Sequence, residues 1–208
     1  MKLHVVPART GTQWVREGLR LFFKQPLAFA GLFFVFMAFS QLAGYVPLAG
    51  EFVSLMLVPA FTVGMMAASR TVEAGRFPLP RLLLTAFRVS PANTRSMLVL
   101  GVLYAAAGLL IVGIASMVGD QGKMAELLAA KGGQLTPEIL KDPAVQEAMR
   151  ANMRMTMLTL VLFLPVSILF WHAPALVHWY QVSIAKSLFF SAVGVLRKAS
   201  AYIFVFMG

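Results

Sequence analysis

Long apolar runs separated by shorter polar stretches follow one another along this chain. Because an α-helix rises about 1.5 Å per residue, about 20 apolar residues are needed to cross the roughly 30 Å hydrocarbon core of a bilayer. Four runs have this length, and they cover residues 27–47, 51–69, 97–118 and 156–180. The pattern predicts an all-α protein, a polytopic transmembrane helix bundle that forms one integral membrane domain over residues 1–208.

A fifth apolar run covers residues 199–208, where the sequence ends. As a helix, these ten residues would reach only about 15 Å, which is half a bilayer. We expect this run to be a partial span, the truncated fifth member of a six-span architecture. The alternative is a short helix that packs against the bundle without crossing the membrane.

The net charge of +10 is distributed unevenly along the chain, because the excess of cations falls on alternate loops. The external segment 119–155 carries five basic and five acidic residues, and the turn between the first two spans carries only Glu51. This alternation follows the positive-inside rule and predicts a cytoplasmic N-terminus; it argues against a nucleic-acid footprint. The three basic segments are residues 1–26 and 70–96, each with five Lys/Arg and one acid, and residues 181–198, with three Lys/Arg and no acid.

Each basic segment contains a predicted amphipathic helix that precedes an apolar run. The clearest is the interfacial helix 10–25, where three basic residues recur at four-residue spacing and aromatic and aliphatic residues occupy the other side. Comparable cytoplasmic segments cover 78–91 and 184–198. The basic side chains expected to contact an anionic inner leaflet are Arg16, Arg20, Lys24, Arg81, Arg88, Lys186, Arg197 and Lys198.

The order of these elements suggests an internal repeat. A Pro-Ala pair, beginning at Pro59 and at Pro174, lies in the span before each of the second and third amphipathic segments. Two span–helix–span units would then be parallel repeats, related by an axis along the membrane normal. The alternative is that similar topological constraints produce similar segments without true repetition.

The external segment is expected to form a solvated surface cap with helical pieces. Gly132-Gly133 interrupts it, whereas Asp142-Pro143 has the form of an N-cap followed by proline at the first helical position. We predict a short helix over 122–131, a turn over 136–141, and a helix that begins at residue 143 and continues into the last full span.

Two histidines lie in the apolar stretch FLPVSILFWHAPALVHWY. Trp179 and Tyr180 are typical of the membrane interface, so His178 is expected to be solvated at headgroup level. His172 would lie about 10 Å deeper, and an ionisable side chain at that depth is a candidate intramembrane polar site. The alternative is a neutral His172 that bonds a backbone carbonyl freed by a nearby proline. Their separation of six residues along one helix corresponds to a rotation of about 240°, so the two rings do not share a face and cannot form a simple metal site.

Glu51 and three prolines are the other candidates for function within the spans. Glu51 is either a solvated interfacial carboxylate or a second candidate polar site paired with an external cation. The prolines should kink their helices, and broken helices can line a substrate site, although kinks are common without one. These prolines are Pro59, Pro165 and Pro174. Small residues such as Gly101 and Gly113 should allow close helix packing.

The sequence contains no cysteine, which excludes disulfides, thiolate metal sites and a cysteine nucleophile. The first apolar run is too long for the core of a cleaved signal peptide and lacks a following A-x-A site. Sequence motifs of serine hydrolases, nucleotide-binding loops and zinc proteases do not occur. We therefore predict no catalytic, cofactor-binding or metal-binding residues, and whether the protein is an enzyme is left open, with no positive signal for one.

Three segments carry a family resemblance: VPARTGTQWVREGLRLFFKQPLAFAGLFF, VPAFTVGMMAASRTVEAGRFPLPRLLLTAFR and FWHAPALVHWYQVSIAKSLFFSAVGVLRK. Through them the chain resembles a family of uncharacterised inner-membrane proteins of Proteobacteria, whose members usually run longer. It also looks distantly like the membrane domain of some glycerophosphodiester phosphodiesterases, without their catalytic domain. The resemblance implies a multi-pass protein of the bacterial inner membrane and brings no assigned activity.

Three functional hypotheses follow. The leading one is a non-enzymatic membrane module that organises lipids of the anionic inner leaflet or partner proteins, in an oligomeric state that the sequence does not define. The alternative is a transporter or permease-like unit with a site between the proline-broken second and fourth spans, near His172. The weakest is a lipid-processing enzyme, because His172 has no evident acid partner or nucleophile.

Overall fold

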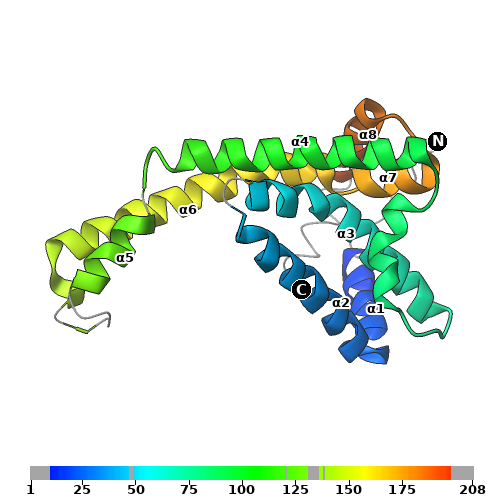
Figure 1. The fold of residues 1–208 in the computed structure, drawn as a ribbon, viewed down its shortest axis with the longest axis horizontal. Helices are drawn as coiled ribbons and strands as arrows, with labels where there is room; N and C mark the ends of the chain where they lie inside the picture. Colours follow the sequence, from blue (N-terminus) through cyan, green and yellow to red (C-terminus); the bar gives the residue numbers. More distant parts are fainter. Residues whose placement is uncertain (1–9, 47–48, 120, 131–135, 138, 198–208) are drawn as a thin grey trace. The chain divides into compact units, whose positions relative to one another are not determined.

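The computed structural model of the protein describes residues 10–46, 49–119, 121–130, 136–137 and 139–197 (Figure 1). Within these residues every regular element is a helix, which confirms the all-α prediction. The partial span expected at 199–208 lies outside the described residues. The elements are α1 (Thr10–Lys24), α2 (Pro26–Gly44), α3 (Ala49–Glu73), the 3-10 helix η1 (Pro80–Phe87), α4 (Pro91–Ala115), α5 (Gln121–Ala130), the 3-10 turn η2 (Ile139–Lys141), α6 (Pro143–Phe170), α7 (Ala173–Tyr180) and α8 (Ile184–Arg197).

Four of the described segments are long and apolar enough to cross a membrane, and they coincide with the four predicted runs. All four begin before the corresponding run, but only Ala49–Glu73 also ends beyond its run; Pro26–Gly44 and Pro91–Ala115 end three residues before theirs, and Pro143–Tyr180 ends with its run. The last segment combines α6 and α7, which are separated by a short break at residues 171–172. The four segments are Pro26–Gly44, Ala49–Glu73, Pro91–Ala115 and Pro143–Tyr180.

The chain divides into two compact units, and α4 and α6 each contribute to both. The first unit comprises residues 1–106 and 167–208, and the second comprises residues 107–166. In the second unit, the Ala144 amide donates a hydrogen bond of 2.7 Å to Asp142 Oδ1, and Pro143 occupies the first position of α6. Asp142 is therefore the N-cap of this helix.

Two clusters of buried side chains hold the first unit together. The first joins α3, η1, α4 and α7, and the second joins α2 to the end of α3. Most other apolar side chains on the long helices are exposed in the protein alone, such as Phe34 and Leu110, as expected for surfaces that face lipid tails. The clusters consist of Ala60, Val63, Ala86, Met97, Leu100, Ala173 and Val177, and of Phe29, Leu32, Ala68 and Val72.

The second amphipathic segment differs from its prediction. An amphipathic helix was expected over 78–91, and the structure has the eight-residue 3-10 helix η1 in its place. Prolines at positions 80 and 91 leave only ten residues between them, and neither can donate a backbone hydrogen bond. The Leu83 backbone also lies so close to α3 that a Cβ atom added to Gly64 would be 2.8 Å from Leu83 Cα. This short, proline-bounded stretch therefore takes a tighter winding against α3.

Close packing of α3 on α4 depends on a second glycine. A Cβ atom at Gly101 would collide with the carbonyl oxygen of Met56, whereas one at Gly113 would meet no described atom within 4 Å. Helix backbones in membranes approach this closely only where side chains are small. Gly101 and Gly113 of α4 consequently have different roles, although the sequence alone assigned both to packing.

The effects of alanine at these two positions should have opposite signs. Gly101→Ala should destabilise the protein by about 1–3 kcal/mol, because α3 must move away from the added methyl group. Gly113→Ala should stabilise it by up to about 1 kcal/mol, because alanine is the better helix former and the site is open. The measurement is the temperature at which half of the detergent-solubilised protein is lost from the monodisperse peak in size-exclusion chromatography. Shifts in the same direction for both variants would contradict the assignment.

Candidate functional site

The basic side chains predicted to contact lipid are exposed wherever the structure describes them. They lie on α1, on η1 and the residue that follows it, and on α8, and they comprise Arg16, Arg20, Lys24, Arg81, Arg88, Lys186 and Arg197. Lys198 lies outside the described residues. Large apolar side chains on the same elements are also exposed: Phe23 by 70%, Phe189 by 61% and Leu196 by 62%. Cationic and apolar side chains are therefore presented together, as on a helix at a membrane interface.

Contacts within the first unit bring the ends of these elements together. Leu21, near the end of α1, packs against the cluster that contains Val72 at the end of α3. The guanidinium carbon of Arg70, in the last turn of α3, lies 4.3 Å from the centroid of the Trp179 ring at the end of α7. This cation–π contact is worth about 0.5–1 kcal/mol at an exposed site.

The start of α4 joins the same group of helix ends through a buried polar pair. Asn93 Nδ2 lies 3.0 Å from the carbonyl oxygen of Ala86 and 3.4 Å from Nδ1 of His178, and both side chains are only 5% exposed. Since the amide nitrogen is a donor, His178 accepts at Nδ1 and carries its proton on Nε2. The ring also meets the neighbouring Trp179 edge to face, with centroids 5.0 Å apart.

The prediction for His178 was wrong. It was expected to be solvated at headgroup level, and instead its side chain on α7 is buried beside η1 and α4. The sequence showed its distance from the end of the span correctly, but the position of a residue along a helix does not say which face is covered. Asn93, 85 positions away, is the residue that makes burial of this ring acceptable.

His172 lies at the break between α6 and α7, and its backbone is held by a residue of α8. The His172 amide donates to Ser191 Oγ at 2.9 Å, and the Ser191 hydroxyl donates to the carbonyl oxygen of Ile168, also at 2.9 Å. In an unbroken helix, the His172 amide would bond the Ile168 carbonyl directly. Ser191 therefore bridges an interrupted backbone ladder, and Pro174 follows in the first turn of α7.

Of the other candidates within the spans, Pro174 lies two residues from His172, whereas Glu51 lies apart from it. Glu51 is exposed in the first turn of α3, about 13 Å along that helix from Ala60, which shares a core cluster with Ala173. Pro59 is buried inside α3 and Pro165 is exposed inside α6. In the described part of the chain, no group of three His, Asp or Glu side chains is placed to hold a metal ion.

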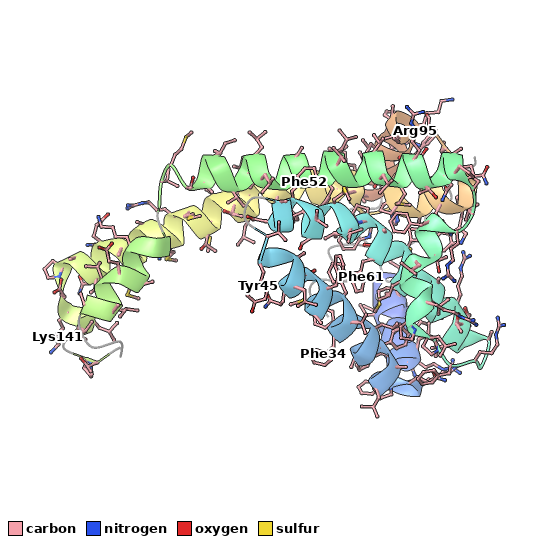
Figure 2. All side chains as sticks on the ribbon, in the orientation of Figure 1. Phe34, Tyr45, Phe52, Phe61, Arg95 and Lys141 are labelled. Carbon is pink, nitrogen blue, oxygen red and sulfur yellow. The ribbon has the colours of Figure 1, made fainter. Side chains whose placement is uncertain are left out.

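An apolar groove lies between α2, α3 and η1, with a volume of about 470 Å³. We call it the α2–α3–η1 groove. Its walls include Phe36 and Phe39 of α2, Phe61 of α3 and Leu84 of η1, and Arg81 contributes the one charged side chain of its lining. The Phe36 and Phe61 rings stack with centroids 4.1 Å apart, and Figure 2 labels Phe61 on the side of α3 that faces α2.

Sequence reasoning missed the residues that organise these features. Ser191, Asn93 and Arg70 were not singled out, because each gains its role from a partner distant in sequence. A weak signal was available for Ser191: with Ser187 and Gly194 it forms a stripe of small residues at helical spacing on α8, and all three are buried. Nothing comparable marked Asn93, which follows a proline at the start of a long apolar helix.

Comparison with known proteins gives one informative result. No protein-family model matches the chain, and no solved structure matches it. The chain is 36% identical over 204 residues to a probable inner membrane protein of Burkholderia thailandensis, a match that covers 97% of this chain and 73% of that relative. The relative's name gives a location and no activity.

Removing the Ser191 hydroxyl should destabilise the junction between α6 and α7. Ser191→Ala would remove both hydrogen bonds of this bridge, at a cost of about 1–3 kcal/mol. The matched control is Ser187→Ala, since Ser187 is equally buried but bonds Ile184 within its own helix. Thermal denaturation in detergent compares the two variants. Equal losses would show that the bridge contributes nothing beyond an ordinary buried hydroxyl.

Proposed function

This chain belongs to the family of the Burkholderia probable inner membrane protein, and we propose that within the inner membrane it is a non-enzymatic module that organises anionic lipids of the cytoplasmic leaflet. The supporting observation is the gathering of the ends of α1, α3 and α7 with the start of α4, next to the exposed basic residues of α1, η1 and α8. Each Lys or Arg near an anionic surface contributes about 1 kcal/mol of attraction. Seven such side chains, on α1, η1, the residue after it and α8, would together attract anionic lipid.

The proposal includes an orientation with the N-terminus in the cytoplasm. The basic segments adjoin the gathered helix ends, whereas the segment 119–155 has balanced charge. The positive-inside rule then assigns the gathered ends to the cytoplasmic side. Arg76, in the loop after α3, and Lys141, in η2, would lie on opposite sides of the membrane.

The remaining hypotheses have less support. A transport site between the second and fourth spans would lie where Ala60, Val63, Ala173 and Val177 pack into one buried core. A likeness to the membrane domain of glycerophosphodiester phosphodiesterases stays a prediction that no comparison supports. A role in organising partner proteins is the other form of the same proposal, and the experiments below distinguish it from the lipid form.

Neutralising the basic stripe of α1 should reduce enrichment of anionic lipid around the protein. The variant replaces Arg16, Arg20 and Lys24 with Gln, and each charge removed should weaken local attraction by about 1 kcal/mol, or about fivefold. The measurement is the ratio of anionic to zwitterionic phospholipid, by mass spectrometry, in polymer discs cut from the native membrane.

A matched control removes the same charge from the other side. Lys123, Lys141 and Arg150, all in the segment 119–155, are replaced by Gln, and the lipid ratio should stay at the wild-type value. An equal fall in both triple variants would mean that net charge alone sets the ratio. A stoichiometric protein in the discs, lost with the α1 variant while the lipid ratio is unchanged, would favour the partner-protein form.

The orientation can be tested directly because the chain has no cysteine of its own. Single variants Arg76→Cys and Lys141→Cys are expressed and exposed to a membrane-impermeant maleimide. In intact spheroplasts, the cysteine at position 141 should be labelled and the cysteine at position 76 should react only after the membrane is disrupted. The reverse pattern would place the N-terminus outside.

A further inference from the structure

The α2–α3–η1 groove has walls of one chemical kind and a single charge. Its volume of about 470 Å³ falls within the range of about 300–1,000 Å³ that is usual for small-molecule sites. Such sites normally combine apolar walls with several polar groups that orient the ligand. Here the apolar walls are accompanied only by Arg81, so the geometry fits a long apolar chain with one anionic group better than it fits a polar metabolite.

Close contacts between α2, α3 and η1, all in the first unit, define the groove. The Leu83 backbone packs directly against Gly64. A Cβ atom added to Gly64 would be 2.8 Å from Leu83 Cα, so η1 lies tightly against α3. The stacked rings of Phe36 and Phe61 join α2 to α3 with centroids 4.1 Å apart. Three elements consequently form the walls, and a bound chain would contact protein on more than one side.

The side chains at the edge of the groove connect it with the lipid-facing surface. Val35 is 46% exposed, Phe39 is 47% exposed and Leu84 is 50% exposed. A lipid tail could therefore enter from the bilayer without crossing a polar barrier. A polar ligand that passed the same apolar edge would lose its hydration without gaining hydrogen bonds there, which disfavours it.

Arg81 supplies the charge that such a ligand would need. Its side chain is exposed, and it makes no ion pair with any residue of the ranges that the structure describes. A guanidinium offers a rigid fork of donors that matches a phosphate with two parallel hydrogen bonds. The long aliphatic stem of Arg81 can lie along the apolar wall while the charged end reaches toward the interface.

We propose that this groove binds one anionic phospholipid, with an acyl chain along α2 and α3 and the phosphate region on Arg81. The inference rests on the proposed function and adds a defined site to it. Moving an acyl chain from lipid into an apolar groove gains little, because lipid tails are as apolar as the walls. Selectivity must therefore come from the guanidinium, and retention from packing against three walls.

The experiment uses the full chain in discs reconstituted with equal amounts of phosphatidylglycerol and phosphatidylcholine. Native mass spectrometry after release into mild detergent counts the lipids that stay bound to each protein molecule. The wild type should retain one lipid, with phosphatidylglycerol preferred. Arg81→Gln should reduce that preference by about tenfold, the size expected for loss of a charge-assisted hydrogen bond.

Two further variants separate charge from shape. Arg95→Gln removes another exposed arginine, outside the groove lining, and should leave the retained lipid and its headgroup unchanged. Leu84→Trp fills the groove from the η1 wall without altering its charge, and it should abolish the retained lipid. Leu84 is half exposed, so the larger side chain should not prevent folding, and a wild-type elution profile verifies this.

The outcomes are distinct from those of the α1 triple variant. The α1 variant changes the average composition of the surrounding lipid, whereas Arg81→Gln changes only the single retained molecule. An unchanged headgroup preference in Arg81→Gln overturns the inference, as does a retained lipid that survives in Leu84→Trp. Retention of a fatty acid or a peptide in place of a phospholipid also overturns it, and none of these results alters the test of the α1 stripe.

Discussion

Backbone amide and carbonyl groups inside a bilayer find no water, and each one left unpaired costs several kcal/mol. Long helices meet this constraint by themselves, since every interior group bonds within its own segment. Two of the places where the described structure departs from continuous helix are the α6–α7 break and the turn between η1 and α4. At each, a polar side chain supplies a bond: Ser191 bridges the Ile168 carbonyl and the His172 amide, and Asn93 donates to the carbonyl of Ala86.

The same constraint explains why small residues matter more here than apolar ones. Burying leucine against another helix gains little when lipid is equally apolar, so helices associate through close contact and hydrogen bonds. Gly64 and Gly101 admit a neighbouring backbone at distances that any side chain would prevent. On α8, Ser187 and Ser191 are fully buried. The Ser191 hydroxyl reaches the carbonyl oxygen of Ile168 on α6 only because no larger side chain separates the two helices.

The spans could be predicted from sequence because their cause is local. Hydrophobic length and the positions of Lys and Arg are properties of short windows, and the four long apolar helices follow from them. The 3-10 winding of η1 reflects its bounding prolines, which the sequence shows, and also its contact with Gly64, which lies on another element. Burial of His178 depends on Asn93, 85 residues away, so no periodicity could reveal it. The histidine that looked peripheral is the buried one, since position along a helix and coverage of a face are independent.

Charge is the remaining means by which such a protein can distinguish one lipid from another. Apolar contacts treat all acyl chains of similar length alike, so a groove lined only by phenylalanine and leucine would retain any lipid that fitted it. A guanidinium beside that groove favours anionic headgroups, and it does so most strongly where little water competes for it. The other six exposed cations, on α1, on α8 and at Arg88 after η1, act differently, because attraction between solvated charges is screened within about 10 Å at ordinary salt. High salt should therefore weaken the general attraction of the surface more than binding at Arg81, because only the latter is coupled to a chain held in the groove.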